Sequence, residues 1–238
     1  MQLLVSVSDG IEAGHALDGG ADLIDAKNPS SGALGAVTLS VLQQIHRVVA
    51  GRRVITAALG DADDEEEVER AVLGHAAVGI GFVKIGFAGI TSIERVERLL
   101  AGAVRGASAR KEAPCGVVAV AYADTAGATS VNHVALVDAA ARAGASGVLL
   151  DTALKHRPGL FELVPQGALE SWVALAHAAR LTVALAGKLS AGDLSRVRDT
   201  GADIAGVRGA ACEGGREGRI VASRVRALGS RLRRAAVG

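Results

Sequence analysis

The stretch TVALAGKLSAGDLSRVRDTGADIAGVRGA, residues 182 to 210, contains a complete strand–helix–strand unit. The apolar runs at 182–187 and 204–210 predict two buried strands, and the more polar segment 190–200 between them predicts a helix. Strands joined through a helix in this way lie parallel in one sheet. This stretch therefore predicts an α/β protein with a parallel sheet.

The same unit recurs along the whole chain. Six further apolar runs predict strands, each followed by a helical segment; they lie at 3–7, 23–27, 54–59, 82–87, 116–124 and 147–152. Eight such units in 238 residues are typical of a (β/α)8 TIM barrel, so we expect a single domain over residues 1–238. An open doubly wound sheet is the alternative, but no GxGxxG motif follows the first strand. Glycines that precede three of the strands predict helix carboxyl-terminal caps: Gly20, Gly144 and Gly201.

Composition narrows the class of protein further. Half of the residues are hydrophobic and the formal net charge is +1, which argues against a general electrostatic nucleic-acid binder. No signal peptide and no uninterrupted apolar stretch of about 18 residues is evident, so we expect a soluble cytoplasmic protein without a membrane partner. Cys115 and Cys212 are far apart, and the histidines form no paired motif, so the sequence indicates neither a zinc site nor a disulfide framework. A homo-oligomer is left open.

Charged residues interrupt strands that should be almost entirely aliphatic. Asp25, Lys27, Lys84 and Asp151 all lie in the second halves of predicted strands, toward the end of the barrel that carries active sites, and Lys155 follows in the next loop. A structural ion-pair network is one interpretation, although buried pairs rarely add net stability. The other is a catalytic cluster, in which burial and neighbouring cations yield a neutral lysine that attacks carbonyls while carboxylates move protons. We favour the cluster, with Asp25 as the companion acid or base of Lys27.

The last two predicted strands end in glycine turns with nearby positive charge. Gly187 and Lys188 follow the seventh strand, and Arg208 and Gly209 close the eighth. Barrels commonly bind phosphate at these two strand ends. We therefore expect a phosphorylated small-molecule substrate, with these four residues around its phosphate.

Taken together, six segments resemble the (5-formylfuran-3-yl)methyl phosphate synthase family, also called 4-(hydroxymethyl)-2-furancarboxaldehyde-phosphate synthase, of methanofuran biosynthesis. They are DAKNPSSGALGA, FVKIGF, AYAD, LLDTALK, ALAGKLS and GVRGAAC. The resemblance implies a lysine-dependent lyase that condenses two glyceraldehyde 3-phosphate molecules with loss of one phosphate and two waters. It implies no metal or redox cofactor. Lys27 matches the family's Schiff-base lysine, and the other active-site positions match Asp25, Lys84, Asp151 and Lys155.

Two local departures and three alternatives accompany this resemblance. Lys188 stands where a small hydroxyl residue is expected, and KHRPGL (155–160) replaces an acidic-glycine turn. Another Schiff-base aldolase acting on a sugar phosphate, or a phosphometabolite-binding barrel without catalysis, would share the same features. The Asp25-x-Lys27 spacing is also similar to that of orotidine monophosphate-type decarboxylases, but their further aspartate is missing from NPSSGALGA (28–36).

Overall fold

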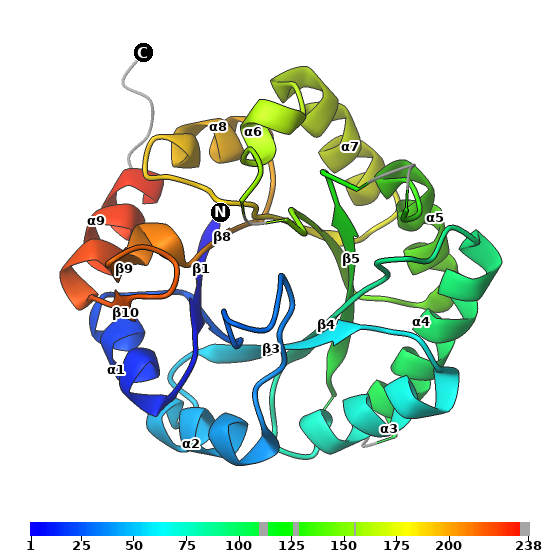
Figure 1. The fold of residues 1–238 in the computed structure, drawn as a ribbon, viewed down its shortest axis with the longest axis horizontal. Coiled ribbons are helices and arrows are strands. Elements are labelled where there is room, and N and C mark those ends of the chain that lie inside the picture. Colours follow the sequence, from blue (N-terminus) through cyan, green and yellow to red (C-terminus); the bar gives the residue numbers. More distant parts are fainter. Residues whose placement is uncertain (110–113, 126–128, 155, 234–238) are drawn as a thin grey trace.

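The computed structural model describes residues 1–109, 114–125, 129–154 and 156–233. Eight parallel strands close into a barrel in chain order, with helices around it, which confirms the predicted (β/α)8 fold (Figure 1). The strands are β1 (Gln2–Val7), β2 (Leu23–Ala26), β3 (Val54–Asp61), β4 (Phe82–Gly86), β5 (Gly116–Tyr122), β6 (Gly147–Asp151), β7 (Thr182–Leu185) and β8 (Ile204–Val207). The helices are α1 (Gly10–Asp18), α2 (Leu39–Val49), α3 (Glu65–Ala76), α4 (Ile93–Ser108), α5 (His133–Ala143), α6 (Leu160–Leu163), α7 (Gln166–Ala178), α8 (Asp193–Asp199) and α9 (Ala222–Arg233).

Apolar side chains fill two regions of the barrel. The larger cluster packs strands against the surrounding helices, and aliphatic residues dominate it. A smaller cluster lies inside the barrel; its buried members are Ala33, Leu34, Ala58, Val120, Tyr122 and Leu149. Burial of this aliphatic surface is the main favourable term in folding. Because the inner cluster is small, polar side chains occupy the remainder of the barrel's interior.

Local sequence signals set the helix ends. Asp64 caps α3 by accepting a hydrogen bond from the Glu67 amide, and the acidic first turn follows it. The glycines predicted to end helices do adopt left-handed backbone, with φ of 82° at Gly20, 78° at Gly144 and 82° at Gly201. Their conformation confirms the predicted helix-to-strand turns. Within the described ranges, no helix is both long and apolar enough to cross a membrane.

The carboxyl-terminal ends of several strands differ from the prediction. β5, β7 and β8 stop at Tyr122, Leu185 and Val207, two or three residues before their apolar runs end. The residues beyond these points are mostly Ala and Gly, with Asp124 and Arg208 among them, and they form turns at the carboxyl-terminal end of the barrel. After β8 the chain forms a 3-10 turn, η1 (Gly209–Ala211), and a short hairpin of β9 (Cys212–Glu213) and β10 (Arg219–Ile220) before α9 begins. In Figure 1 this hairpin lies beside α9 and α1, and the segment between β2 and α2 projects over the barrel centre.

Candidate active site

Four of the five predicted catalytic residues come together at the carboxyl-terminal end of the barrel, hereafter the mouth. Asp25 lies on β2 and Lys84 on β4, whereas Asp151 ends β6 and Lys27 follows the last residue of β2. Their exposed fractions are 0, 5, 2 and 6 percent, in that order. Two cations and two carboxylates are therefore nearly removed from water within one small volume.

Asp25 is held by three neighbouring strands. Ser6, Asp25 and Thr56 are register partners on β1, β2 and β3, so their side chains lie at one level of the barrel. Both hydroxyls donate to the Asp25 carboxylate at 2.7 Å, and the Lys84 Nζ also lies 2.7 Å from it. This set of donors offsets the cost of burying the carboxylate.

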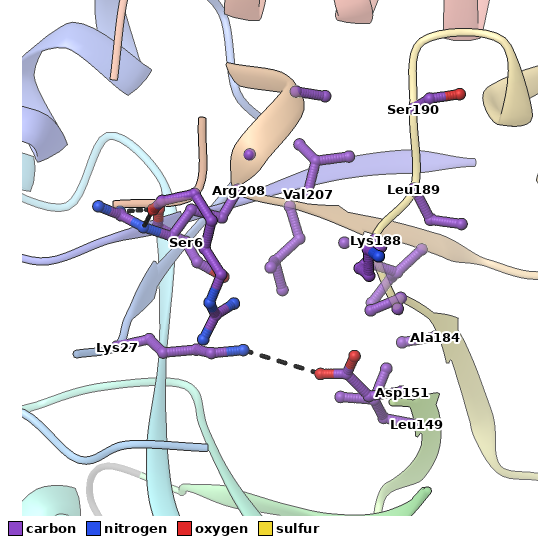
Figure 2. A pocket seen from close by; sticks show the side chains of 18 of the residues that line it. Ser6, Lys27, Leu149, Asp151, Ala184, Lys188, Leu189, Ser190, Val207 and Arg208 are labelled. Carbon is purple, nitrogen blue, oxygen red and sulfur yellow. Dashed lines mark hydrogen bonds and ion pairs between the residues drawn. The ribbon is translucent and has the colours of Figure 1, made fainter. Parts of the chain in front are cut away.

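Lys27 faces a different carboxylate from the one expected. Its Nζ lies 3.7 Å from Asp151 Oδ2, across the mouth from β2 to β6, as Figure 2 shows. The other oxygen of Asp151, Oδ1, accepts the amide of Thr152 at 2.7 Å. Because Asp25 is paired with Lys84, the companion carboxylate of Lys27 in the described structure is Asp151.

Lys155, the fifth predicted catalytic residue, lies outside the described residues. The loop immediately before it is fixed by Asp124, which follows β5. The Asp124 carboxylate accepts the amides of Ala153 and Leu154, each at 2.7 Å. Asp124, in the quoted AYAD segment, thus fixes the backbone of the β6 loop as far as residue 154.

A cavity of about 540 Å³ opens beside the lysine–carboxylate pairs. All four predicted phosphate-site residues line it: Gly187, Lys188, Arg208 and Gly209. The backbone of Gly187 has φ of 104°, a conformation that disfavours a side chain. Lys188 is exposed, and its Nζ donates to the carbonyl of Arg157 at 2.7 Å. The predicted phosphate residues and the charged pairs therefore share one cavity.

Arg208 lines the cavity but is committed to the protein itself. Its guanidinium forms an ion pair with Glu12 at 2.8 Å and donates to the carbonyls of Ser6, Arg216 and Gly218. Burial raises the pKa of Glu12, but hydrogen bonds from Arg208 and Ser8 outweigh burial and hold that pKa below its ordinary value. The paired Glu12 neutralises the charge of Arg208, so this arginine braces the loops of the mouth.

Sequence reasoning missed a buried tyrosine at the mouth. Tyr122, at the end of β5, donates its hydroxyl to Asp61 Oδ1 at 2.8 Å, and the same oxygen accepts the Ala88 amide at 3.0 Å. Burial raises the pKa of Tyr122 well above its ordinary value, and the Asp61 charge shifts it in the same direction. The phenol therefore stays protonated and links β3, β5 and the loop after β4. Only its place at the end of an apolar run could have indicated this role.

Arg216 was also missed. It lies between β9 and β10 and lines the cavity together with Lys27 and Asp151. The surrounding EGGREGR (213–219) has the composition of a surface turn, so the sequence gives no indication that its arginine lines the cavity. Across the described ranges, no group of three or more His, Cys, Asp or Glu side chains could hold a metal ion.

The fold and these side chains define a class of protein. It is a TIM-barrel enzyme with buried lysine–carboxylate pairs at the carboxyl ends of its strands, where barrel enzymes carry their active sites.

Comparison with known proteins identifies the family. The family model for 4-HFC-P synthase matches residues 3–229. The (5-formylfuran-3-yl)methyl phosphate synthase of Methanopyrus kandleri is 41% identical over 220 residues, which cover 90% of each protein. The enzyme of the same name from Archaeoglobus fulgidus is 37% identical over 226 residues, covering 92% of this chain and 94% of that protein. The chain belongs to the (5-formylfuran-3-yl)methyl phosphate synthase family, as its motifs predicted.

Solved structures agree on the fold. The 3-hexulose-6-phosphate synthase of Salmonella typhimurium superimposes with a TM-score of 0.67, covering 98% of both chains at 17% sequence identity. At that identity the likeness extends to the TIM barrel alone.

Proposed function

We propose that the protein condenses two molecules of glyceraldehyde 3-phosphate to (5-formylfuran-3-yl)methyl phosphate, the phosphorylated furan of methanofuran biosynthesis. One phosphate and two waters leave, which balances the two substrate molecules against the product. Family membership supports the product, and the buried Lys27–Asp151 pair beside a cavity is the observation that carries the chemistry. No metal or redox cofactor enters this scheme.

Lys27 is the proposed nucleophile. Its amine attacks the aldehyde carbon of one substrate molecule, and loss of water gives an imine. The imine acidifies the neighbouring carbon, so that a proton leaves this carbon before the adjacent carbon–oxygen bond to phosphate breaks. Hydrolysis of a later imine returns the water and frees Lys27. The position of Lys27 supports this assignment, because burial disfavours its ammonium form and the Asp151 carboxylate can take the proton that the amine must lose before it attacks.

Asp151 is the proposed proton carrier for these steps. Its carboxylate lies 3.7 Å from the Lys27 Nζ, close enough to exchange a proton with a group attached to that nitrogen directly or through one water. Lys84 has a different role in the proposal, because it is paired with Asp25 at 2.7 Å. An ammonium there stabilises negative charge that develops on the substrate and donates protons. Lys155 is proposed as the second acid–base group.

The test is product analysis with glyceraldehyde 3-phosphate as the sole substrate. We expect a furan phosphate with the expected mass and one inorganic phosphate for each furan formed. A phosphorylated product of another skeleton would favour a different Schiff-base aldolase. Formation of no product at all would favour a binding barrel without catalysis.

Borohydride trapping tests the nucleophile directly. The chain has only five lysines, so a reduced imine has few positions to occupy. Modification of Lys27 should block tryptic cleavage after residue 27 and add mass to the peptide that spans 1–47. Lys27→Ala and Lys27→Arg should both abolish product, since a guanidinium does not act as an amine nucleophile near neutral pH. Trapping that survives in Lys27→Ala but disappears in Lys155→Ala would reverse the two roles.

A further inference from the structure

Arg216 reaches across the mouth from the β9–β10 hairpin. Its Nη2 donates to the carbonyls of Pro29 at 3.1 Å and Gly32 at 2.9 Å, both in the segment that follows Lys27. The residue is half-buried and lines the cavity that also contains Lys27 and Asp151. The guanidinium therefore connects the β9–β10 hairpin to the loop after β2.

Contacts from Arg208 and Gly209 fix the backbone around Arg216. Arg208 donates to the carbonyl of Arg216 at 2.8 Å and to that of Gly218 at 3.2 Å, while its own charge is paired with the buried Glu12. Gly209 lies against the same backbone, since a Cβ built on it would be 3.6 Å from the Arg216 nitrogen. The arginine is thus preorganised next to a predicted phosphate turn.

Arg216 differs from Arg208 in having no carboxylate within ion-pair distance among the described residues. Within that part of the chain, its guanidinium donates to the backbone carbonyls of Pro29 and Gly32, and both hydrogen bonds leave from Nη2. Burial lowers the pKa of Arg216, while the charge of Asp151 opposes this shift and that of Arg208 adds to it. A partly desolvated guanidinium with Nε and Nη1 left over matches the bidentate geometry of a phosphate.

We propose that Arg216 is a substrate-binding residue that holds the phosphate group of the phosphorylated aldehyde in this cavity. The inference rests on the proposed function for the identity of the substrate, but an anion site for phosphate monoesters would exist without it. The two cations predicted for this task fit it less well. Glu12 neutralises Arg208, and Lys188 is exposed and donates to a backbone carbonyl of its own neighbourhood.

The experiment measures binding of sn-glycerol 3-phosphate by calorimetry to the wild type and three variants. This probe keeps the phosphate but has no aldehyde, so no imine forms. Arg216→Gln should raise its dissociation constant about 10- to 100-fold, since one charge-assisted contact is lost. The dissociation constant of Arg216→Lys should lie between those of the wild type and Arg216→Gln, because the charge remains while the planar guanidinium is lost. Arg219→Gln is the matched control: Arg219 lies on the same hairpin but pairs with Asp9 and is mostly exposed.

Each outcome supports or overturns the proposal. A selective loss in Arg216→Gln, with the Arg219→Gln protein binding like the wild type, supports it. Equal binding by Arg216→Gln and wild type, an equal loss in both glutamine variants, or no binding by the wild type would overturn it. Circular dichroism of each variant establishes that the barrel is folded.

A second measurement separates this proposal from the proposed function. Borohydride trapping is compared between glyceraldehyde 3-phosphate and unphosphorylated glyceraldehyde. Arg216→Gln should reduce the preference for the phosphorylated aldehyde while leaving the trapping of glyceraldehyde unchanged; an unchanged preference would count against the proposal. If the wild type forms no furan yet Arg216→Gln weakens glycerol 3-phosphate binding, the proposed function fails and the anion site stands.

Discussion

The Asp25–Lys84 ion pair should couple strongly in a stability measurement. Asp25 is fully buried and Lys84 is 5% exposed, with 2.7 Å between their charged groups. Asp25→Asn keeps the shape of the side chain but leaves the Lys84 ammonium without its counter-ion. Lys84→Met keeps most of the stem but leaves a buried carboxylate whose remaining side-chain donors, among the described residues, are the Ser6 and Thr56 hydroxyls.

The expected magnitudes follow from this burial. Breaking a buried pair by removing one partner costs about 3–5 kcal/mol, so each single variant should lose about that much free energy of unfolding. Replacing both partners removes both uncompensated charges and is often close to neutral. The double variant should therefore be more stable than the sum of the single losses predicts, by at least about 3 kcal/mol.

The wild type, the two single variants and the double variant form a double-mutant cycle, and urea unfolding measures the free energy of unfolding of each. Far-UV circular dichroism reports secondary structure, and fluorescence of the single tryptophan, Trp172, reports its buried surroundings on α7. If the two probes report the same transition, unfolding is two-state, and a single free energy of unfolding describes each protein. The exposed Arg70–Glu66 pair provides a matched control cycle, which should give coupling of less than about 1 kcal/mol.

Two results would refute the reasoning. If Asp25→Asn unfolds at the same urea concentration as the wild type, the carboxylate does not compensate Lys84. If the double variant loses as much as the two single variants combined, the two groups do not interact. Either result would also remove the reason for giving Lys84 a different role from that of Lys27.

Four further predictions concern separate parts of the molecule. The pKa of Glu12 is lowered in the folded state, so the stabilisation by its carboxylate is present above its unfolded pKa of about 4.3 and is lost as the pH falls below that value. In urea titrations, the Glu12→Gln variant should have a lower free energy of unfolding than the wild type near neutral pH, and this difference should shrink toward about pH 3. Burial raises the pKa of Cys115 to about 11, so iodoacetamide near pH 8 should alkylate it only after unfolding, as peptide mass mapping would reveal. Gly209→Val should raise the KM for glyceraldehyde 3-phosphate with little effect on urea stability, because a Cβ there meets no atom closer than 3.6 Å; an unchanged KM would remove Gly209 from the phosphate site. Asp151→Asn should lower turnover about 10²–10⁴-fold while borohydride still traps the imine at Lys27, and loss of trapping would assign Asp151 to imine formation as well.

The fold was predictable because its signal repeats. Every strand of the barrel is an apolar run followed by a helix, and eight repeats leave few architectures. The strand ends were less predictable, because small residues such as Ala186 and Gly187 after Leu185 satisfy a strand pattern as well as a turn. The β9–β10 hairpin gave no strand pattern in the sequence, because each of its strands is only two residues long.

The site was predictable by residue but not by pairing. Charge within a buried strand identifies Asp25, Lys84 and Asp151 from sequence, because such strands otherwise carry aliphatic side chains. Which carboxylate meets which lysine depends on how each side chain reaches across the mouth, and the strand pattern does not specify this. Lys27 shares a stretch of three residues with Asp25, yet its described ion pair is with Asp151, 124 positions away.

This distribution of charge bears on how the cavity attracts its substrate. Asp25 neutralises Lys84, Asp151 neutralises Lys27 and Glu12 neutralises Arg208, so these three cations contribute little net field to an approaching anion. Arg216 has no such partner among the described carboxylates and lies beside the same cavity. In the proposed function, the paired lysines serve the chemistry, which needs groups that exchange protons, whereas phosphate attraction falls to Arg216, a cation that keeps its proton throughout. Arginine at position 216 and lysine at position 27 are not interchangeable for this reason.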